Sequence, residues 1–195
     1  AGNFADVFKH VLLVDLIRCL SGKDKPFSYI ETHAGIGSYD LKTKAAQATR
    51  EFNQGINKLL TAAQDTAAPE AITRYLQQIT QHRTQLKSQH SYPGSPRLVR
   101  NLLRANDQMI LSELHAQDAQ QLKQHFLRDH QVAVHESDGY LALKAFLPPK
   151  PNRGLVLIDP PFEREDEFSH LFERLTLATQ RWPQGIYAIW YPIKQ

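Results

Sequence analysis

The sequence has a single cysteine, Cys19, so it cannot form an internal disulfide and suits a reducing compartment. It has no apolar run near the about 20 residues of a membrane span, because Asp15 and Arg18 interrupt the longest candidate. No apolar core with a small-residue cleavage site opens it, so we expect no signal peptide. These absences predict a cytoplasmic protein without a membrane partner, in which Cys19 is a small, buried apolar side chain.

What is present is the composition of an ordinary folded protein, with 42% hydrophobic and 22% charged residues. That balance excludes a disordered, collagen-like or disulfide-scaffold chain. The length of 195 residues fits one domain, or one domain with a small insertion.

The charge is unevenly distributed along the chain. Residues 44–104 contain nine basic and three acidic residues, a balance of +6, and the remainder is −3. A cationic region on a slightly acidic chain suggests that a polyanion docks there. An ordinary solvated helical surface explains the charge about equally well.

Hydrophobic periodicity predicts an alternation of helices and short apolar strands. Helices are expected at residues 4–20, 116–126, 139–146 and 168–178, and strands at 27–31, 109–113, 132–135, 154–158 and 185–190. Between them, residues 43–89 read as a helical insertion of two helices separated at 67–69, followed by a turn at 92–96. This pattern predicts an α/β protein whose sheet is mostly parallel, with helices on both faces.

Three strand ends carry residues suited to a nucleoside-type ligand, which binds such sheets at the carboxyl ends of strands. Gly35 and Gly37 form a turn that lets the backbone approach a ligand closely. Glu113 can accept hydrogen bonds from ribose hydroxyls, and Asp138, beside Gly139, can accept from an adenine amino group. Each has a structural alternative: a tight turn, a surface acid and a helix N-cap, respectively.

The fourth strand end, Asp159-Pro160-Pro161-Phe162, is the most specific motif. The prolines fix the backbone and remove two donors, so Asp159 and the Pro160 carbonyl can hold both hydrogens of an exocyclic amino group. That alignment turns the amino lone pair toward an electrophile. Phe162 can stack on an extruded base, a contact that contributes about 1–3 kcal/mol. The alternative is a strand ended by prolines, with Asp159 capping a helix.

With this motif the sequence resembles the RlmJ-type enzymes, S-adenosylmethionine-dependent methyltransferases of adenine N6 in 23S ribosomal RNA. The resemblance extends over the whole chain, in Ala1-Gly2-Asn3, Ala5-Asp6-Val7, Lys9-His10, Lys23-Asp24-Lys25-Pro26-Phe27, Thr32-His33-Ala34-Gly35, Tyr92-Pro93-Gly94-Ser95-Pro96, Glu113-Leu114-His115, Asp138-Gly139, Ile158-Asp159-Pro160-Pro161 and Gly185-Ile186-Tyr187-Ala188.

The resemblance implies a Rossmann-like class I methyltransferase fold with a small helical subdomain. We therefore expect residues 1–43 and 92–195 to form the methyltransferase domain and residues 44–91 to be the inserted subdomain. The positions that match the family's cofactor site are His10, His33, Ser95, Glu113, Asp138, Gly139 and Asp159. Asp159 also matches the catalytic acceptor, and Lys9 lies in the family's amino-terminal motif, near its site.

The sequence departs from the family pattern in two respects. The pattern has a Tyr- and His-containing segment before Ala1 and further strands after Pro192, so we expect the sheet to lack an edge here. Phe162 stands where the family often has Tyr, which keeps stacking and loses a hydroxyl.

The expected reaction is direct methyl transfer to 23S ribosomal RNA by a monomer, without a metal. No HExxH spacing is present, and His135-Glu136 lacks the cysteines of a zinc deaminase. The candidate phosphate contacts are Arg74, Arg83, Lys87, Arg97, Arg100 and Arg104. Alternatives are a DNA adenine methyltransferase, which usually has a separate recognition domain, a non-catalytic RNA-binding factor, and a nicotinamide-dependent dehydrogenase.

Overall fold

The computed structural model describes residues 1–65, 67–162 and 166–193. The chain divides into two compact units, each with a hydrophobic core of its own. Unit 1 comprises residues 1–19 and 37–102, and unit 2 comprises residues 20–36 and 103–195. This division differs from the expected boundaries, because residues 1–19, 37–43 and 92–102 group with the inserted helices.

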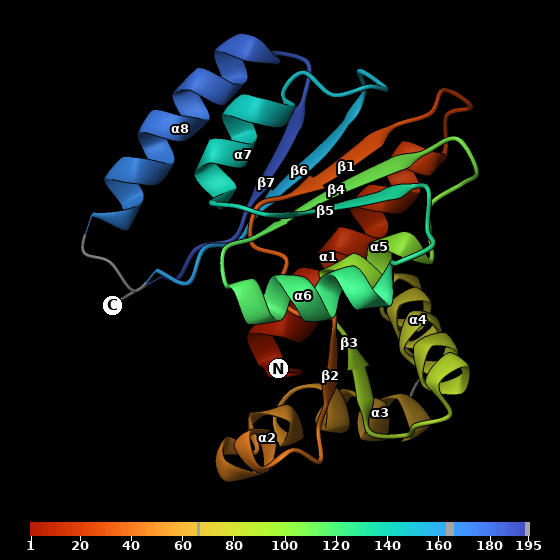
Figure 1. Ribbon diagram of the computed structural model, residues 1–195. Coiled ribbons are helices and arrows are strands. Elements are labelled where there is room, and N and C mark those ends of the chain that lie inside the picture. The colour runs from red at the N-terminus through yellow and green to blue at the C-terminus, as the bar shows by residue number, and fades with distance from the viewer. Residues whose placement is uncertain (66, 163–165, 194–195) are drawn as a thin grey trace. The chain divides into compact units, whose positions relative to one another are not determined.

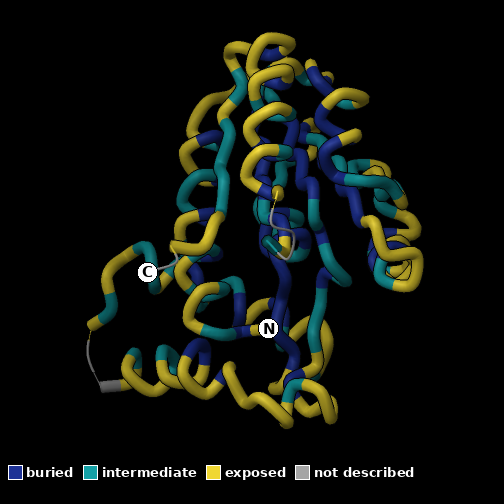
Figure 2. The backbone as a smooth tube through the Cα atoms, turned by 90° about the vertical axis from the view of Figure 1, so that its left-hand side faces the viewer, coloured by how far each residue is buried: buried dark blue, intermediate teal, exposed yellow. Residues whose placement is uncertain are grey.

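Unit 2 contains a five-stranded sheet in the order β5-β4-β1-β6-β7 (Figure 1), and every neighbouring pair is parallel. Its strands are β1 (Ser28–Glu31), β4 (Gln108–Glu113), β5 (Val132–Glu136), β6 (Gly154–Ile158) and β7 (Ile186–Ile189). The central strand β1 and its neighbour β6 are buried over their full length, as strands covered on both faces must be (Figure 2). The predicted α/β class and parallel sheet are confirmed.

The helices of unit 2 are α6 (Ala116–His125), α7 (Gly139–Phe146) and α8 (Glu167–Arg181). The β4-α6-β5 connection runs in one direction along the sheet, and the connections through α7 and α8 run in the other. Right-handed crossovers therefore place α6 on one face and α7 with α8 on the other. Helices α7 and α8 pack against each other there (Figure 1).

Unit 1 is helical, with a small antiparallel pair of strands. Helix α1 (Phe4–Ser21) belongs to this unit up to residue 19. The other elements are β2 (Ser38–Asp40), α2 (Lys44–Thr49), the 3-10 helix η1 (Glu51–Asn53), α3 (Ile56–Asp65), α4 (Glu70–Leu86), β3 (Ser91–Pro93) and α5 (Ser95–Arg100). Val14, Ile56, Tyr75, Ile79 and Tyr92 belong to its core. The two predicted helices α3 and α4 are confirmed: α3 ends before residues 67–69, and α4 begins after them.

Two details of unit 1 were not predicted correctly. Residues 91–93 pair with β2, whereas the Tyr92-Pro93 sequence had indicated a turn. Proline is tolerated there because a two-stranded pair consists of edge strands alone. Cys19 is exposed rather than buried, since it falls off the face of α1 that buries Leu13, Val14 and Ile17.

Among the described helices, none combines the length and the apolar character that a membrane crossing requires.

Candidate cofactor and active site

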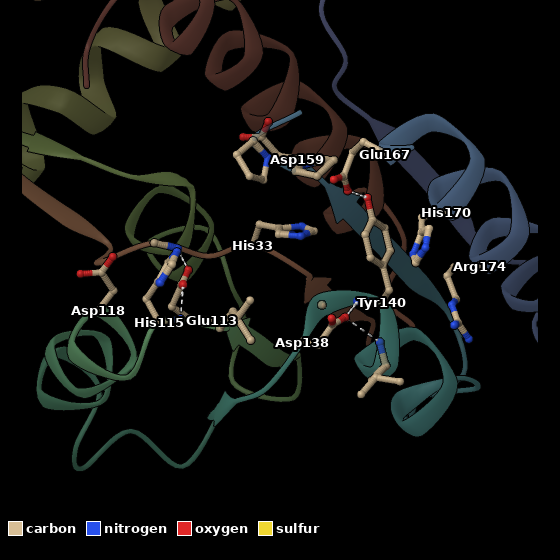
Figure 3. Close-up of a pocket in the computed structure, with 16 residues that line it drawn as sticks. His33, Glu113, His115, Asp118, Asp138, Tyr140, Asp159, Glu167, His170 and Arg174 are labelled. Atoms are coloured by element: carbon tan, nitrogen blue, oxygen red, sulfur yellow. Dashed lines mark hydrogen bonds between the residues drawn. The ribbon is translucent and has the colours of Figure 1, made fainter. Parts of the chain in front are cut away.

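The carboxyl ends of β1, β4, β5 and β6 surround a pocket of about 550 Å³ in unit 2 (Figure 3). Parallel strands bring their carboxyl ends to one edge of the sheet, where α/β proteins bind ligands. The structure brings seven predicted site residues together in its lining: His33, Gly35, Glu113, Asp138, Gly139, Asp159 and Pro160.

Glu113, the last residue of β4, is only 7% exposed and is therefore no ordinary surface acid. One carboxylate oxygen accepts the Gly35 amide at 2.8 Å, and the other accepts the His115 amide at 2.9 Å. Gly35 has a φ of +60°, a conformation that favours glycine. Glu113 thus fixes the glycine turn, and its oxygens have further lone pairs for ligand hydroxyls.

Asp138 is the N-cap of α7, so its structural alternative is realised. Its Oδ1 accepts the amides of Tyr140 at 2.7 Å and Leu141 at 3.1 Å. A Cβ on Gly139 would collide with the Thr32 carbonyl, which explains the glycine there. Asp138 also lines the pocket, so one carboxylate can cap the helix and face a ligand.

Asp159 follows β6 and, with Pro160 and Pro161, forms another part of the pocket wall. Phe162 is not part of the lining: its ring contacts Phe168, with the centroids 4.9 Å apart. Phe162 also has a φ of +52°, which is strained for an aromatic residue. The structure therefore groups the motif's acceptors with the pocket, and the predicted aromatic plate with Phe168.

The pocket is acidic. It is lined by the carboxylates of Glu113, Asp118, Asp138, Asp159 and Glu167, and Arg174 is the one Lys or Arg in its described lining. Burial lowers the pKa of His33 below 6.5, although Asp159 and three other carboxylates oppose this shift. His33 is consequently neutral near pH 7, with Nδ1 2.8 Å from Thr32 Oγ1.

Several lining residues were not predicted. They are Leu114, His115, Asp118, Tyr140, Leu141, Pro161, Glu167, His170 and Arg174. Glu167, His170 and Arg174 stand at i, i+3 and i+7 of α8, so helical periodicity after the Asp159 motif could have revealed that shared face. Across the described residues, no three His, Cys, Asp or Glu side chains gather closely enough to hold a metal ion.

The other residues of the expected cofactor site lie in unit 1. His10 is buried, and its Nδ1 lies 2.9 Å from the Tyr92 hydroxyl. Burial, followed by the charge of Lys9, lowers the pKa of His10 to about 3. Ser95 is the first residue of α5 and is buried. Lys9 is half-buried, 3.6 Å from Asp6.

The predicted phosphate contacts differ in how far the fold itself uses them. Arg74 bonds to Asp15 at 2.9 Å and pairs with Glu70, and Arg83 donates from Nε to the Ser91 carbonyl. Lys87 is exposed at the end of α4. Arg97 and Arg100 lie half-buried on α5.

Arg104 serves the fold of unit 2 instead. Its guanidinium donates to the carbonyls of Ser21, Lys23 and Lys25 and to both oxygens of Asp107, which is fully buried. All of its nitrogens are therefore engaged, and its expected role as a phosphate contact is corrected to a structural one.

Comparison with known proteins adds to this geometry. The family model described as "Ribosomal RNA large subunit methyltransferase D, RlmJ" matches residues 24–195. Two proteins named ribosomal RNA large subunit methyltransferase J, from Haemophilus influenzae and Escherichia coli, are 40% and 39% identical over 193 residues. Each match covers 99% of this chain and 68% of the relative.

A solved structure has the same fold over nearly the whole of this chain. The crystal structure of a protein from Legionella pneumophila superposes with a TM-score of 0.88 at 37% identity, covering 99% of this chain and 70% of that one. Because the family model matches most of the chain and the relatives match nearly all of it, the chain belongs to the RlmJ family of ribosomal RNA large subunit methyltransferases.

Proposed function

We propose that this protein transfers a methyl group from S-adenosylmethionine to N6 of an adenine in 23S ribosomal RNA. The observation that carries the proposal is that Asp159 and Pro160 line the same pocket as Glu113, Gly35 and Asp138. A motif suited to an amino acceptor thus borders a pocket suited to a nucleoside.

The charge of the pocket fits this cofactor. When bound, S-adenosylmethionine supplies an electrophilic methyl group on a positively charged sulfonium. Five carboxylates line the pocket, and neutral His33 adds no competing positive charge. A cation is therefore favoured in this field over a neutral ligand of similar shape. Glu113 would accept hydrogen bonds from the ribose hydroxyls of the cofactor, and Asp138 would accept one from its adenine amino group.

Asp159 and the Pro160 carbonyl would orient the amino group of the target adenine. Each accepts a hydrogen bond from one amino hydrogen, so the nitrogen lone pair faces the methyl donor and most of the rate gain comes from orientation. The new N–C bond replaces the S–C bond of the sulfonium, and the Asp159 carboxylate is placed to take the proton that the nitrogen then releases. Pro160 and Pro161 have no N–H that could compete for these acceptors. Phe162, beside Phe168, is the proposed stacking surface for the extruded base.

The partner in this proposal is 23S ribosomal RNA, gripped through its phosphates by the cationic helices of unit 1. Lys87 is exposed, and Arg83 and Arg97 are part-exposed; Arg74 also pairs with Asp15. Cytoplasmic location and a monomeric state belong to the same proposal.

The test compares the protein with Asp159→Ala, using labelled S-adenosylmethionine and unmodified 23S RNA, followed by digestion to nucleosides. We expect N6-methyladenosine from the parent and from the control Glu173→Ala, which removes an exposed carboxylate of α8, but not from Asp159→Ala. Duplex DNA in a parallel reaction separates an RNA enzyme from a DNA enzyme. If the protein binds the cofactor but methylates neither RNA nor DNA, its substrate is a different one. If it shows no cofactor binding and no methylation, the proposal is contradicted.

A further inference from the structure

A hydrogen bond inside the pocket connects the two helices on one face of the sheet. The Tyr140 hydroxyl, in the first turn of α7, donates to the carboxylate of Glu167, the first residue of α8 (Figure 3). Both residues are buried, and Glu167 is 5% exposed. A buried carboxylate needs such a donor, because an unsatisfied charge in the interior is costly.

Tyr140 also contacts residues that follow two strands of the sheet. Its amide donates to Asp138 at 2.7 Å, and its ring meets the edge of His33 with centroids 5.5 Å apart. Figure 3 shows the His33 imidazole directed toward the Tyr140 ring, with Asp159 and Asp138 on either side of it. Tyr140 is therefore held by the part of the pocket that is proposed to bind the adenine of the cofactor.

Glu167 is linked instead to the motif that is proposed to hold the target adenine. It opens α8, the helix that follows the Asp159-Pro160-Pro161-Phe162 motif along the chain. The next residue, Phe168, contacts Phe162 at the end of that motif. A shift of the start of α8 would thus move a direct neighbour of the motif.

We propose that Tyr140 and Glu167 are positioning residues, whose hydrogen bond keeps the Asp159 motif aligned with the cofactor-binding turn at residues 138–141. This inference rests on the proposed function, because it assigns the cofactor to one side of the bond and the target adenine to the other. Neither side chain is required to touch the reacting atoms. The bond acts through geometry, to which rates are sensitive: a misplacement of about 1 Å can cost about 100-fold.

Two truncations test the bond. Tyr140→Phe and Glu167→Ala are each expected to lower kcat about 10-fold while KM for S-adenosylmethionine changes less than about 3-fold. Glu167→Gln keeps an acceptor oxygen for the Tyr140 hydroxyl and should restore most of the lost kcat. The double variant Tyr140→Phe/Glu167→Ala should be no slower than the worse single variant, because both remove one interaction.

The matched control is Tyr187→Phe. The Tyr187 hydroxyl donates to the backbone carbonyls of Ala178 and Trp182, and Tyr187 does not line the pocket. Its loss removes a tyrosine hydrogen bond from the same unit, so we expect lower thermal stability and an unchanged kcat. If Tyr140→Phe behaves like this control, with parental kcat, the positioning role is wrong.

Hydrogen–deuterium exchange without cofactor separates this inference from the proposed function. Tyr140→Phe should speed exchange in the first two turns of α8, from Glu167 onward, and Tyr187→Phe should not. Faster exchange in a protein that methylates no RNA would support the coupling and contradict the proposed function. Unchanged exchange and kcat in an active enzyme would overturn the inference and leave the proposed function standing.

Discussion

At the residue scale, the carboxylate of Glu113 joins two backbone amides, those of Gly35 and His115. Hydrogen bonds from an amide to a charged carboxylate are about twice as strong as neutral ones. The side chain therefore sets the shape of the glycine turn without a ligand, and its remaining lone pairs are free to accept hydrogen bonds from one.

In Glu113→Gln, the side-chain NH₂ group replaces one carboxylate oxygen. A donor then faces the backbone N–H of Gly35 or of His115, and that hydrogen bond is lost. We expect Glu113→Gln to weaken binding of S-adenosylhomocysteine by about 10- to 100-fold, through the lost ribose contact and the disturbed turn. Isothermal titration calorimetry measures this. Glu136→Gln is the control, because Glu136 is exposed and its ion pair with Lys123 is long, at 4.0 Å. Equal affinities of the two variants for S-adenosylhomocysteine would contradict the role assigned to Glu113.

His10 gives the fold a pH dependence with a definite sign. Its pKa is about 3 in the folded protein and near 6.5 when unfolded, so the unfolded chain binds the additional proton. Stability is therefore full above pH 6.5 and is lost as the pH falls toward 3. Between pH 7.5 and 5.5 the parent should lose roughly 1 kcal/mol more than His10→Gln. Urea unfolding at both pH values checks this, and parallel losses would contradict it.

At the element scale, Asp138 at the start of α7 is both a helix cap and a carboxylate that lines the pocket. Asp138→Ala should destabilise the protein by about 1 kcal/mol, the usual cost of a lost N-cap. Asp138→Ser restores a capping oxygen but shortens its reach into the pocket. We expect parental stability for Asp138→Ser in thermal melts, and weakened cofactor binding for both variants. Undiminished cofactor binding by Asp138→Ser would reduce Asp138 to a cap.

At the scale of the whole molecule, the cationic segment should make RNA binding depend on salt. Each phosphate contact removed should reduce the slope of log K against log salt by about 0.7 to 0.9. Lys87→Gln is expected to do so, whereas Lys150→Gln, an exposed lysine of unit 2, is the matched control. Filter binding across a salt series measures both slopes. An RNA affinity insensitive to salt would contradict the proposed grip.

The sequence by itself determined the alternation of strands and helices in unit 2. Continuous apolar segments such as residues 154–158 are buried on both faces, so their composition reveals them, and the residues after each strand could be named as pocket residues in advance. It also carried the Asp159 motif, whose chemistry depends on residue type and order. Short elements escaped prediction, because three residues such as 38–40 are too few to show a period.

Only the tertiary structure decided which of these residues share a wall and which are used elsewhere. Arg104 and Lys87 both belong to the cationic segment 44–104 of the sequence, yet Arg104 is enclosed by Asp107 and three carbonyls, whereas Lys87 is exposed. The Tyr140–Glu167 bond joins residues 27 positions apart. Pairings of that kind depend on how two helices pack against each other on one face of a sheet, which local periodicity does not encode.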